Sequence, residues 1–294
     1  MAVTVEPLTP HFGARLTGFS IRDGLSDDDF KAIDSAANTY GLVVMPCQQL
    51  DDETQVSFSE RLGPLEETLV GAVGAGSKIV RVTNILADGT LKDPDSQLAL
   101  FTRANFMWHT DSSFKAHPAK FSMLSARELP TNGGGDTEFA STAAAFDMLP
   151  EETQARLEGL IAIHSIAWSR EKFQKGSSSE EQRKRLPPVP QALVRTNPVT
   201  GRKSLHIASH VMGIDGMEDL EGLALHNDLL ALATHPSKVW RHQWSPDDAI
   251  IWDNRAIVHR ATPYDESGDR RLMIRTTISD FGPTVVDGAI VAAA

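Results

Sequence analysis

The run AIIWD at residues 249–253 consists of apolar and β-branched side chains followed by Asn254, which is typical of a short buried β-strand. Further runs of this kind lie between Lys78 and Ile278, and most are separated by turn-forming Gly, Pro, Asn or Asp. Many short strands favour a β-barrel or a β-sandwich. The runs are IVRVTNI (79–85), FSMLSA (121–126), DTEFA (136–140), LVRT (193–196), SLHIA (204–208), KVWRHQW (238–244) and RLMIRTTI (271–278).

Helical patterns lie before and between these runs. Ser26 precedes three aspartates and an apolar series at helical spacing that stops at Gly41, and a second helical pattern runs from Asp51 to Leu62. The apolar run LVVMP stands between the two and reads as a strand. Two helical insertions are predicted later, at 141–159 and 218–234. The sequence therefore predicts a β core decorated with helices rather than alternating βαβ units.

Two polar segments read as loops long enough to cover an active site. They are residues 87–103 and the charged run 169–190, which contains GSSSEEQRKR. The second is equally compatible with an ordinary solvated surface excursion.

The composition fits one globular domain over residues 1–294, because 41% of the residues are hydrophobic and 23% are charged. A net charge of -11 and a pI near 5.3 exclude nucleic acid as the main partner, since phosphate backbones need clustered Lys and Arg. A small anionic substrate stays compatible with this charge, because a few buried arginines set the local potential in a cleft.

The single cysteine, Cys47, cannot form an internal disulfide, and the opening MAVTVEPLTP lacks the pattern of a signal peptide. No run reaches the roughly 18 apolar residues that cross a bilayer. We expect a cytoplasmic protein without membrane contact, and assembly into a homo-oligomer is left open.

The segment FMWHTDSSF places His109 and Asp111 two positions apart, so on an extended strand both side chains emerge on one face. Far downstream, IIWDNRAIVHRA places His259 just after a strongly apolar strand. Two imidazoles and one carboxylate match the facial triad that holds Fe(II) with open coordination positions. A His-x-Asp pair alone arises often by chance, and a histidine on an apolar strand is more often a core residue.

A third element supports the metal site. In DRRLMIRTTI, Arg271 follows His259 by twelve positions and shares a strand face with Arg275. Two inward arginines require anionic partners, because an unpaired buried charge costs several kcal/mol. The guanidinium of Arg271 could bind one carboxylate of a dicarboxylate co-substrate through two parallel hydrogen bonds. Arg275 is placed to bind a second anionic group, which would belong to the substrate. The alternative is that both arginines pair with surface carboxylates.

These residues resemble the taurine and dichlorophenoxyacetate dioxygenase family over almost the whole chain. The motifs are WHTD (108–111), GGDTEF (134–139), WDNR (252–255), HRA (259–261) and RRLMIRTT (270–277). FSMLSA, RLPPV, LVRT and GRKSLHI bring the match closer to the dichlorophenoxyacetate branch. The resemblance implies a double-stranded β-helix, or jelly-roll, core.

The resemblance also implies roles for individual residues. His109, Asp111 and His259 would bind Fe(II), with 2-oxoglutarate and O₂ as co-substrates and succinate and CO₂ as products. Thr137 and Arg271 would bind the distal carboxylate of 2-oxoglutarate, and Arg275 the acidic group of the substrate. Two further substrate-pocket candidates are Asn105, which otherwise reads as a loop residue, and His210, which is as readily a structural histidine. Arg270 should point to the opposite strand face.

The segment PLEETLVGAVGAG (64–76) departs from the family, because it lacks the histidine with which taurine enzymes grip a sulfonate. This departure argues against taurine as the substrate, and the resemblance to the dichlorophenoxyacetate branch implies an aryloxyalkanoate such as dichlorophenoxyacetate. Hydroxylation beside its ether oxygen gives a hemiacetal that collapses to a phenol and an oxo acid without a dedicated base.

Several alternatives remain open from the sequence. They are a hydroxylase of another anion, such as an N-acyl amino acid or an alkylsulfonate, a non-catalytic metal- or carboxylate-binding protein, and a zinc hydrolase that uses the same three ligands. A serine hydrolase is excluded, because the sequence has no G-x-S-x-G elbow.

Overall fold

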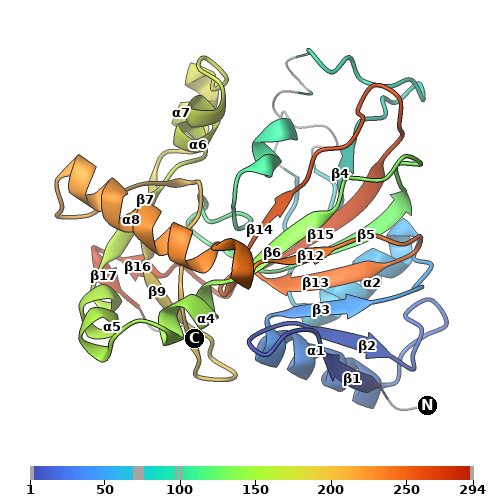
Figure 1. Ribbon diagram of the computed structural model, residues 1–294, viewed down its shortest axis with the longest axis horizontal. Helices are drawn as coiled ribbons and strands as arrows, with labels where there is room; N and C mark the ends of the chain where they lie inside the picture. The colour runs from blue at the N-terminus through green and yellow to red at the C-terminus, as the bar shows by residue number, and fades with distance from the viewer. Residues whose placement is uncertain (1–2, 69–75, 97–98, 100–101, 292–294) are drawn as a thin grey trace.

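A seven-stranded sheet forms the middle of the computed structural model, which describes residues 3–68, 76–96, 99 and 102–291 (Figure 1). Its order is β1-β2-β3-β13-β5-β15-β4, and all neighbours are antiparallel except β2 and β3. The bounds are β1 Thr4–Pro7, β2 Ala14–Thr17, β3 Leu42–Met45, β4 Val80–Thr83, β5 Ala119–Glu128, β13 Ala249–Asp253 and β15 Leu272–Ser279.

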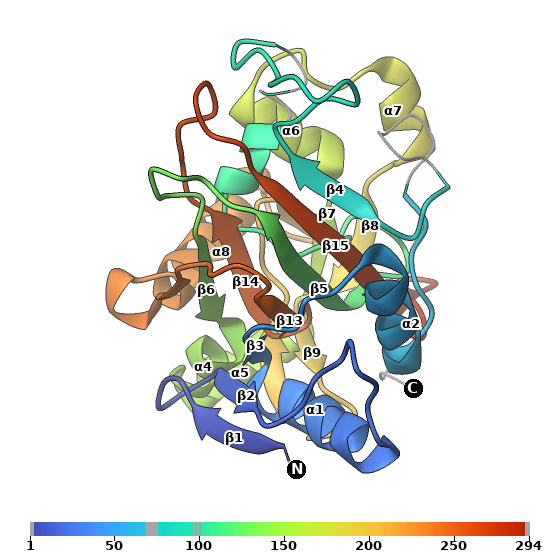
Figure 2. The ribbon, with the colours of Figure 1, turned by 90° about the vertical axis from the view of Figure 1, so that its right-hand side faces the viewer.

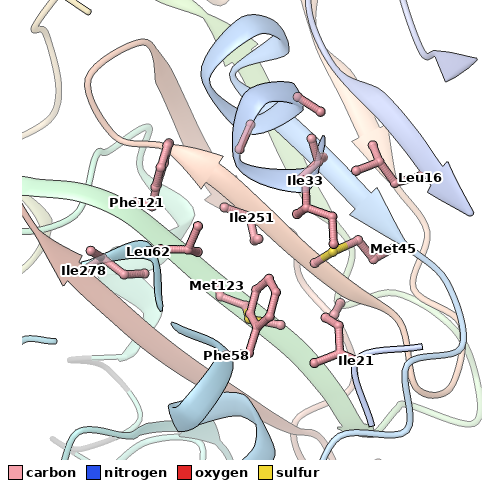
Figure 3. Close-up of a cluster of buried hydrophobic side chains, with 14 of the residues drawn as sticks. Leu16, Ile21, Ile33, Met45, Phe58, Leu62, Phe121, Met123, Ile251 and Ile278 are labelled. Atoms are coloured by element: carbon pink, nitrogen blue, oxygen red, sulfur yellow. The ribbon is translucent and has the colours of Figure 1, made fainter. Parts of the chain in front are cut away.

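Two helices cover one face of this sheet, α1 (Asp27–Tyr40) and α2 (Asp52–Leu62) (Figure 2). Ser26 caps α1 by accepting a hydrogen bond from the Asp29 amide, and Gly41 ends the helix with φ 72°. Apolar side chains of both helices pack onto β3, β5, β13 and β15 in one buried cluster, which Figure 3 shows from close by. Its labelled members are Leu16, Ile21, Ile33, Met45, Phe58, Leu62, Phe121, Met123, Ile251 and Ile278.

A smaller sheet lies against the other face, in the order β12-β6-β14. Its strands are β6 (Thr137–Ser141), β12 (Trp240–His242) and β14 (Ile257–Ala261). A second apolar cluster fills the space between the two sheets and includes Phe139, Trp252 and Met273. Two mainly antiparallel sheets packed face to face confirm the predicted jelly-roll.

The remaining elements form a third layer beside the two sheets (Figure 1). A third apolar cluster joins its short strands to α4 and α8. The helices are α4 (Thr142–Asp147), α5 (Glu151–Glu158), α6 (Ile166–Phe173), α7 (Glu180–Arg185) and α8 (Asp219–Ala233), with 3₁₀ turns at Ala104–Phe106 (η1) and Pro236–Lys238 (η2). The strands are β7 (Ile161–His164), β8 (Val189–Ala192), β9 (Val194–Thr196), β10 (Lys203–Leu205), β11 (Val211–Ile214), β16 (Val285–Val286) and β17 (Ala289–Ile290).

The structure corrects two predictions of local structure. The insertion expected at 141–159 is two helices, α4 and α5, with Pro150 between them. The loop expected at 169–190 holds most of α6 and all of α7, because Ser179 caps the charged run and the i,i+4 pair Glu180–Lys184 supports it at 2.7 Å. The expected loop 87–103 falls partly outside the described residues.

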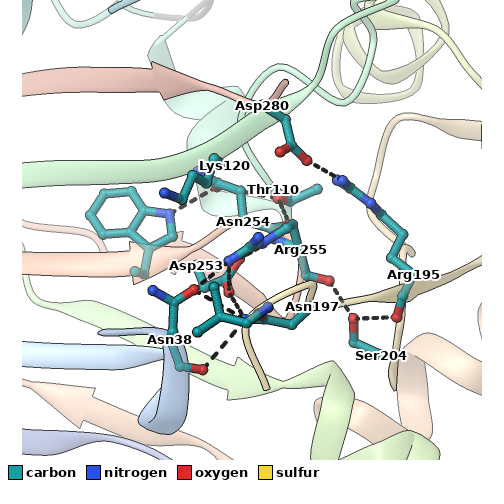
Figure 4. A network of polar contacts seen from close by, with 12 residues as sticks. Asn38, Thr110, Lys120, Arg195, Asn197, Ser204, Asp253, Asn254, Arg255 and Asp280 are labelled. Carbon is teal, nitrogen blue, oxygen red and sulfur yellow. Dashed lines mark hydrogen bonds and ion pairs between the residues drawn. The ribbon is translucent and has the colours of Figure 1, made fainter. Parts of the chain in front are cut away.

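The turn after β13 carries a buried ionic cluster (Figure 4). Arg255 and Asp253 are each 1% exposed and form two hydrogen bonds of 2.8 Å, from Nε to Oδ1 and from Nη2 to Oδ2. Asn38 accepts from Arg255 at 3.0 Å, and Asn197 donates to Asp253 at 3.2 Å. This cluster fastens α1 to the end of the central sheet.

Within the described residues, the chain has no helix that is both long and apolar enough to cross a membrane.

Candidate metal centre

His109 and His259 lie directly opposite each other in an isolated antiparallel bridge. His259 lies in β14, the strand that follows the apolar strand β13, and it exchanges backbone hydrogen bonds of 2.8 and 2.9 Å with His109. Directly opposed residues of an antiparallel pair project to the same face. The ring centroids consequently lie 4.2 Å apart.

Asp111 joins them by a route that the sequence did not predict. An extended strand through residues 109–111 was expected, but His109 forms only an isolated bridge and Asp111 begins a turn. The Asn254 side chain fixes this turn by accepting from the Asp111 amide at 3.0 Å. One ligand atom from each of the three residues still falls within 4.8 Å of the others, and all three are buried.

The donor set fits a divalent metal. His109 Nδ1 lies 2.8 Å from the Met107 carbonyl oxygen, so the neutral ring donates there and keeps Nε2 for a ligand bond. His259 Nε2 lies 3.8 Å from Asp111 Oδ2, a separation that a shared ion can bridge. Two imidazole nitrogens and one carboxylate leave further coordination positions open.

The charge states also suit metal binding. Burial is the largest of the effects that lower the pKa of His109 and of His259, so both rings are neutral at pH 7. Burial alone would raise the pKa of Asp111, but Arg275 and the two histidines hold it well below the ordinary value. Neutral imidazole and ionised carboxylate are the forms that bind metals.

Arg275 reaches the same centre from β15. Its Nη1 forms an ion pair with Asp111 Oδ1, and its side chain is 22% exposed while that of Asp111 is 5% exposed. Its Nε is buried and donates to no acceptor within the described part of the chain. The anionic partner expected for Arg275 is therefore Asp111, a buried candidate metal ligand. It is not a surface carboxylate, which was the alternative.

Arg271 lies one residue before β15 and is buried. Its Nε and Nη2 donate to the Gly135 carbonyl at 3.2 and 2.9 Å. Burial lowers the pKa of Arg271 to about 10. Gly135 has φ +68°, and a Cβ there would lie 2.9 Å from Arg271 Nε, so only glycine leaves room for the guanidinium.

Thr137 follows Gly135 by two positions, at the start of β6. Its side-chain oxygen accepts from the Trp244 indole N–H at 3.0 Å. Because an indole N–H is only a donor, the Thr137 hydroxyl keeps its own proton to donate. Thr137 therefore lies two positions from the carbonyl group that Arg271 contacts, at one end of the smaller sheet.

The remaining candidates differ in their surroundings. His210 is buried, its Nδ1 lies 2.8 Å from Ser169 Oγ, and its ring packs edge-on against Phe114 at 5.1 Å. Burial and then the neighbouring His109 lower its pKa well below 6.5, so His210 is neutral and adjoins the metal centre. Asn105 is half-buried in η1, which packs on β14 and α6. Arg270 points outward to Glu128, as expected.

Sequence reasoning missed several residues around the site. Ser122 donates to Asp111 Oδ2 at 2.7 Å, Trp244 donates to Thr137, and Gly135 accepts from Arg271. Asn254 lay inside the WDNR motif but received no role. Only Gly135 gave a signal, as part of a three-glycine run, since hydrogen bonds between distant strands leave no local pattern in a sequence.

A family model described as taurine catabolism dioxygenase TauD, TfdA family matches residues 4–277. The chain belongs to this family. The matched range spans the metal centre and both arginines.

Two curated relatives and one solved structure resemble this TauD/TfdA chain closely. The alpha-ketoglutarate-dependent 2,4-dichlorophenoxyacetate dioxygenase of Cupriavidus pinatubonensis is 36% identical over 285 residues, 95% of this chain and 99% of the relative. The (S)-phenoxypropionate/alpha-ketoglutarate-dioxygenase of Sphingobium herbicidovorans is 36% identical over 287 residues, 95% of each. The crystal structure of AAD-2 in complex with Mn(II) and N-oxalylglycine has a TM-score of 0.89 at 38% identity, covering 98% of this chain and 100% of that one.

These likenesses confirm the predicted class of enzyme. The TauD/TfdA chain is a dioxygenase that depends on 2-oxoglutarate, which is alpha-ketoglutarate, and it carries a His-Asp-His metal-binding cluster.

Proposed function

We propose that this enzyme uses Fe(II), 2-oxoglutarate and O₂ to hydroxylate an aryloxyalkanoate, which then breaks down to a phenol and an oxo acid. The observation that carries the proposal is the buried cluster of His109, Asp111 and His259, which Arg275 contacts through Asp111. Arg271, four positions before Arg275, is also buried and donates to the Gly135 carbonyl. The relatives named for dichlorophenoxyacetate and phenoxypropionate support the substrate class, because both compounds join an aryl ether to a carboxylate.

His109, Asp111 and His259 would hold Fe(II) through two nitrogens and one oxygen. When bound, the metal would supply activation of O₂ at the expense of 2-oxoglutarate and hydroxylation of a substrate C–H bond. The chain contributes position and charge: the Met107 carbonyl fixes the His109 ring, and the buried walls keep both imidazoles neutral.

Thr137 and Arg271 would bind the distal carboxylate of 2-oxoglutarate. Within the described residues, Arg271 Nη1 has no hydrogen-bond acceptor, and the Thr137 hydroxyl still has a proton to donate. Arg271 is held in place by Gly135, so little conformational freedom is lost on binding. N-oxalylglycine, the compound bound by AAD-2, carries the same two terminal carboxylates as 2-oxoglutarate, which supports this assignment.

Arg275 would bind the substrate carboxylate next to the metal centre. Its Nη1 forms the ion pair with Asp111, whereas its buried Nε has no hydrogen-bond acceptor among the described residues and is free to donate to the substrate. A carboxylate between the arginine and the metal centre would bring the adjoining CH₂ or CH group to the reacting position. His210 and Asn105 would line the same pocket, with neutral His210 able to donate to a carboxylate or ether oxygen.

The test is succinate formation by anaerobically Fe(II)-loaded protein that receives 2-oxoglutarate, O₂ and one compound from a panel. The panel holds aryloxyacetates, 2-aryloxypropionates, N-acyl amino acids and taurine, and phenol release is measured in parallel. We expect one aryloxy acid to stimulate succinate formation with matching phenol. Stimulation by an N-acyl amino acid or taurine alone would reject the substrate class, and catalysis without 2-oxoglutarate would reject the mechanism.

A further inference from the structure

Asn254, which Figure 4 labels, is buried and contacts Asp111 of the metal centre. Its Oδ1 accepts from the Asp111 amide and from the Trp252 indole N–H, both at 3.0 Å. Its Nδ2 lies 2.9 Å from the Ser122 hydroxyl oxygen. Ser122 belongs to β5 and lies 2.7 Å from Asp111 Oδ2.

The orientation of the Asn254 amide follows from its partners. A backbone amide and an indole nitrogen can only donate, so the atom that faces both must be the carbonyl oxygen. The NH₂ group must therefore face Ser122. Because that NH₂ group can only donate, the Ser122 oxygen is its acceptor, and the Ser122 proton is directed to Asp111 Oδ2.

This chain of hydrogen bonds fixes both ends of Asp111. Asn254 holds the Asp111 backbone directly and holds its carboxylate through Ser122. The three side chains are at most 5% exposed, so water does not compete for these bonds. Trp252 in turn keeps the Asn254 amide from flipping.

We propose that Ser122 and Asn254 are positioning residues that hold the Asp111 carboxylate ready for the metal. The proposal rests on the metal site of the proposed function but is independent of the substrate. Hydrogen bonds that orient metal ligands contribute about 10- to 100-fold to metal affinity. Neither residue contacts the reacting atoms, so each acts through Asp111.

The experiment measures Mn(II) affinity of the metal-stripped full chain by titration calorimetry, together with the Tm of the metal-free protein. The first comparison is Ser122→Ala with Ser125→Ala. Both serines lie on β5 and are buried, but they project to opposite faces of the sheet, and Ser125 donates to Gln55 at 2.6 Å instead. We expect Ser122→Ala to weaken Mn(II) binding by about 10-fold or more and Ser125→Ala by less than about 3-fold, with similar losses of Tm.

The second comparison isolates the hydroxyl group. Ser122→Thr and Ser122→Val place nearly the same volume at the site, but only threonine keeps the O–H. We expect the Ser122→Thr protein to bind Mn(II) about 10-fold more tightly than the Ser122→Val protein. Equal affinities for this pair, or equal losses for the two alanine variants, would reject the positioning role. If the wild-type chain bound no Mn(II), the proposed metal site would fall as well, whereas wild-type binding that is insensitive to Ser122 would reject only this inference.

Discussion

Two buried ionic clusters meet at the turn after β13, and they differ in what their charged groups contact. In the structural cluster, Arg255 and Asp253 form a bidentate pair that the side chains of Asn38 and Asn197 also contact. Arg255 Nη1 alone of this pair has no hydrogen-bond partner among the described residues. In the metal cluster, Asp111 and His259 point ligand atoms at each other across 3.8 Å, and Arg275 stays partly exposed. Asn254, between the two residues of the structural pair, belongs to the metal cluster.

The difference shows how a buried charge reveals its role. A bidentate pair with supporting hydrogen bonds compensates the cost of removing two charges from water. In the metal cluster, Arg275 and Ser122 compensate the Asp111 charge, but His259 Nε2 faces Asp111 Oδ2 at 3.8 Å without a hydrogen bond. A bound metal ion would account for that arrangement. We therefore expect changes in the first cluster to affect folding and changes in the second to affect metal and substrate binding.

The largest expected effect is loss of a metal ligand. His109→Ala should abolish substrate-stimulated succinate formation and saturable Mn(II) binding, because only two of the three protein ligands remain and two are too few to hold the metal. The matched control is His226→Ala, since His226 is also buried and also lies 2.9 Å from a backbone carbonyl oxygen. Turnover by His109→Ala, or equal loss in the control, would contradict the assignment.

Removing the structural arginine should affect stability instead. Arg255→Met leaves the Asp253 charge buried without its partner, which costs about 3–5 kcal/mol in the free energy of unfolding. Arg202→Met is the control, because Arg202 pairs with exposed Asp147 at 2.7 Å and such pairs contribute up to about 1 kcal/mol. Chemical denaturation gives both values, and Mn(II) affinity of the folded Arg255→Met protein should stay within about 3-fold of wild type. If Arg255→Met lowered the Mn(II) affinity without lowering the free energy of unfolding, the assignment of a structural role to this cluster would be wrong.

The two arginines of the site should separate kinetically. Arg271→Gln should raise KM for 2-oxoglutarate, and Arg275→Gln should raise KM for the aryloxy acid, each by about 30-fold or more if the lost pair is worth about 2 kcal/mol. Steady-state kinetics with each ligand varied in turn measures both constants. Equal changes for both ligands in both variants would reject the division of roles.

The last prediction concerns His164, a buried histidine outside both clusters, and the pH dependence of stability. Burial lowers its pKa to about 3, and neither ring nitrogen has a partner among the described residues. An unfolded histidine takes up a proton near pH 6.5, so the unfolded state binds more protons below that pH. The contribution of neutral, buried His164 to the free energy of unfolding is thus fully present above about pH 6.5 and is lost as the pH falls toward 3.

Replacing His164 removes this contribution. His164→Gln should reduce the pH dependence of the unfolding free energy between pH 6 and pH 4 by up to about 1.4 kcal/mol per pH unit. Denaturation of metal-free protein at several pH values measures it. Exposed His117→Gln is the control and should leave the slope unchanged.

Much of the secondary structure could be predicted from local patterns, and sequence motifs indicated the three residues that the structure brings together as candidate metal ligands. The caps at Ser26 and Gly41 mark α1, the run AIIWD is β13, and alternation along β15 places Arg275 toward the site. Helix α7 was missed because its charged face resembles a solvated loop, and only the Ser179 cap and the ion pairs of its side chains indicate a helix.

The sequence by itself determined which residue types are available for chemistry, because hydrophobic periodicity and motif order are local properties. Tertiary structure alone decided that His109 lies opposite His259, that Asp111 reaches them from a turn, and that Arg275 meets Asp111. It also decided that Ser122 and Asn254, 132 positions apart, share one hydrogen bond. Pairing between distant strands depends on the packing of the whole core, and no local pattern records which residues it brings into contact.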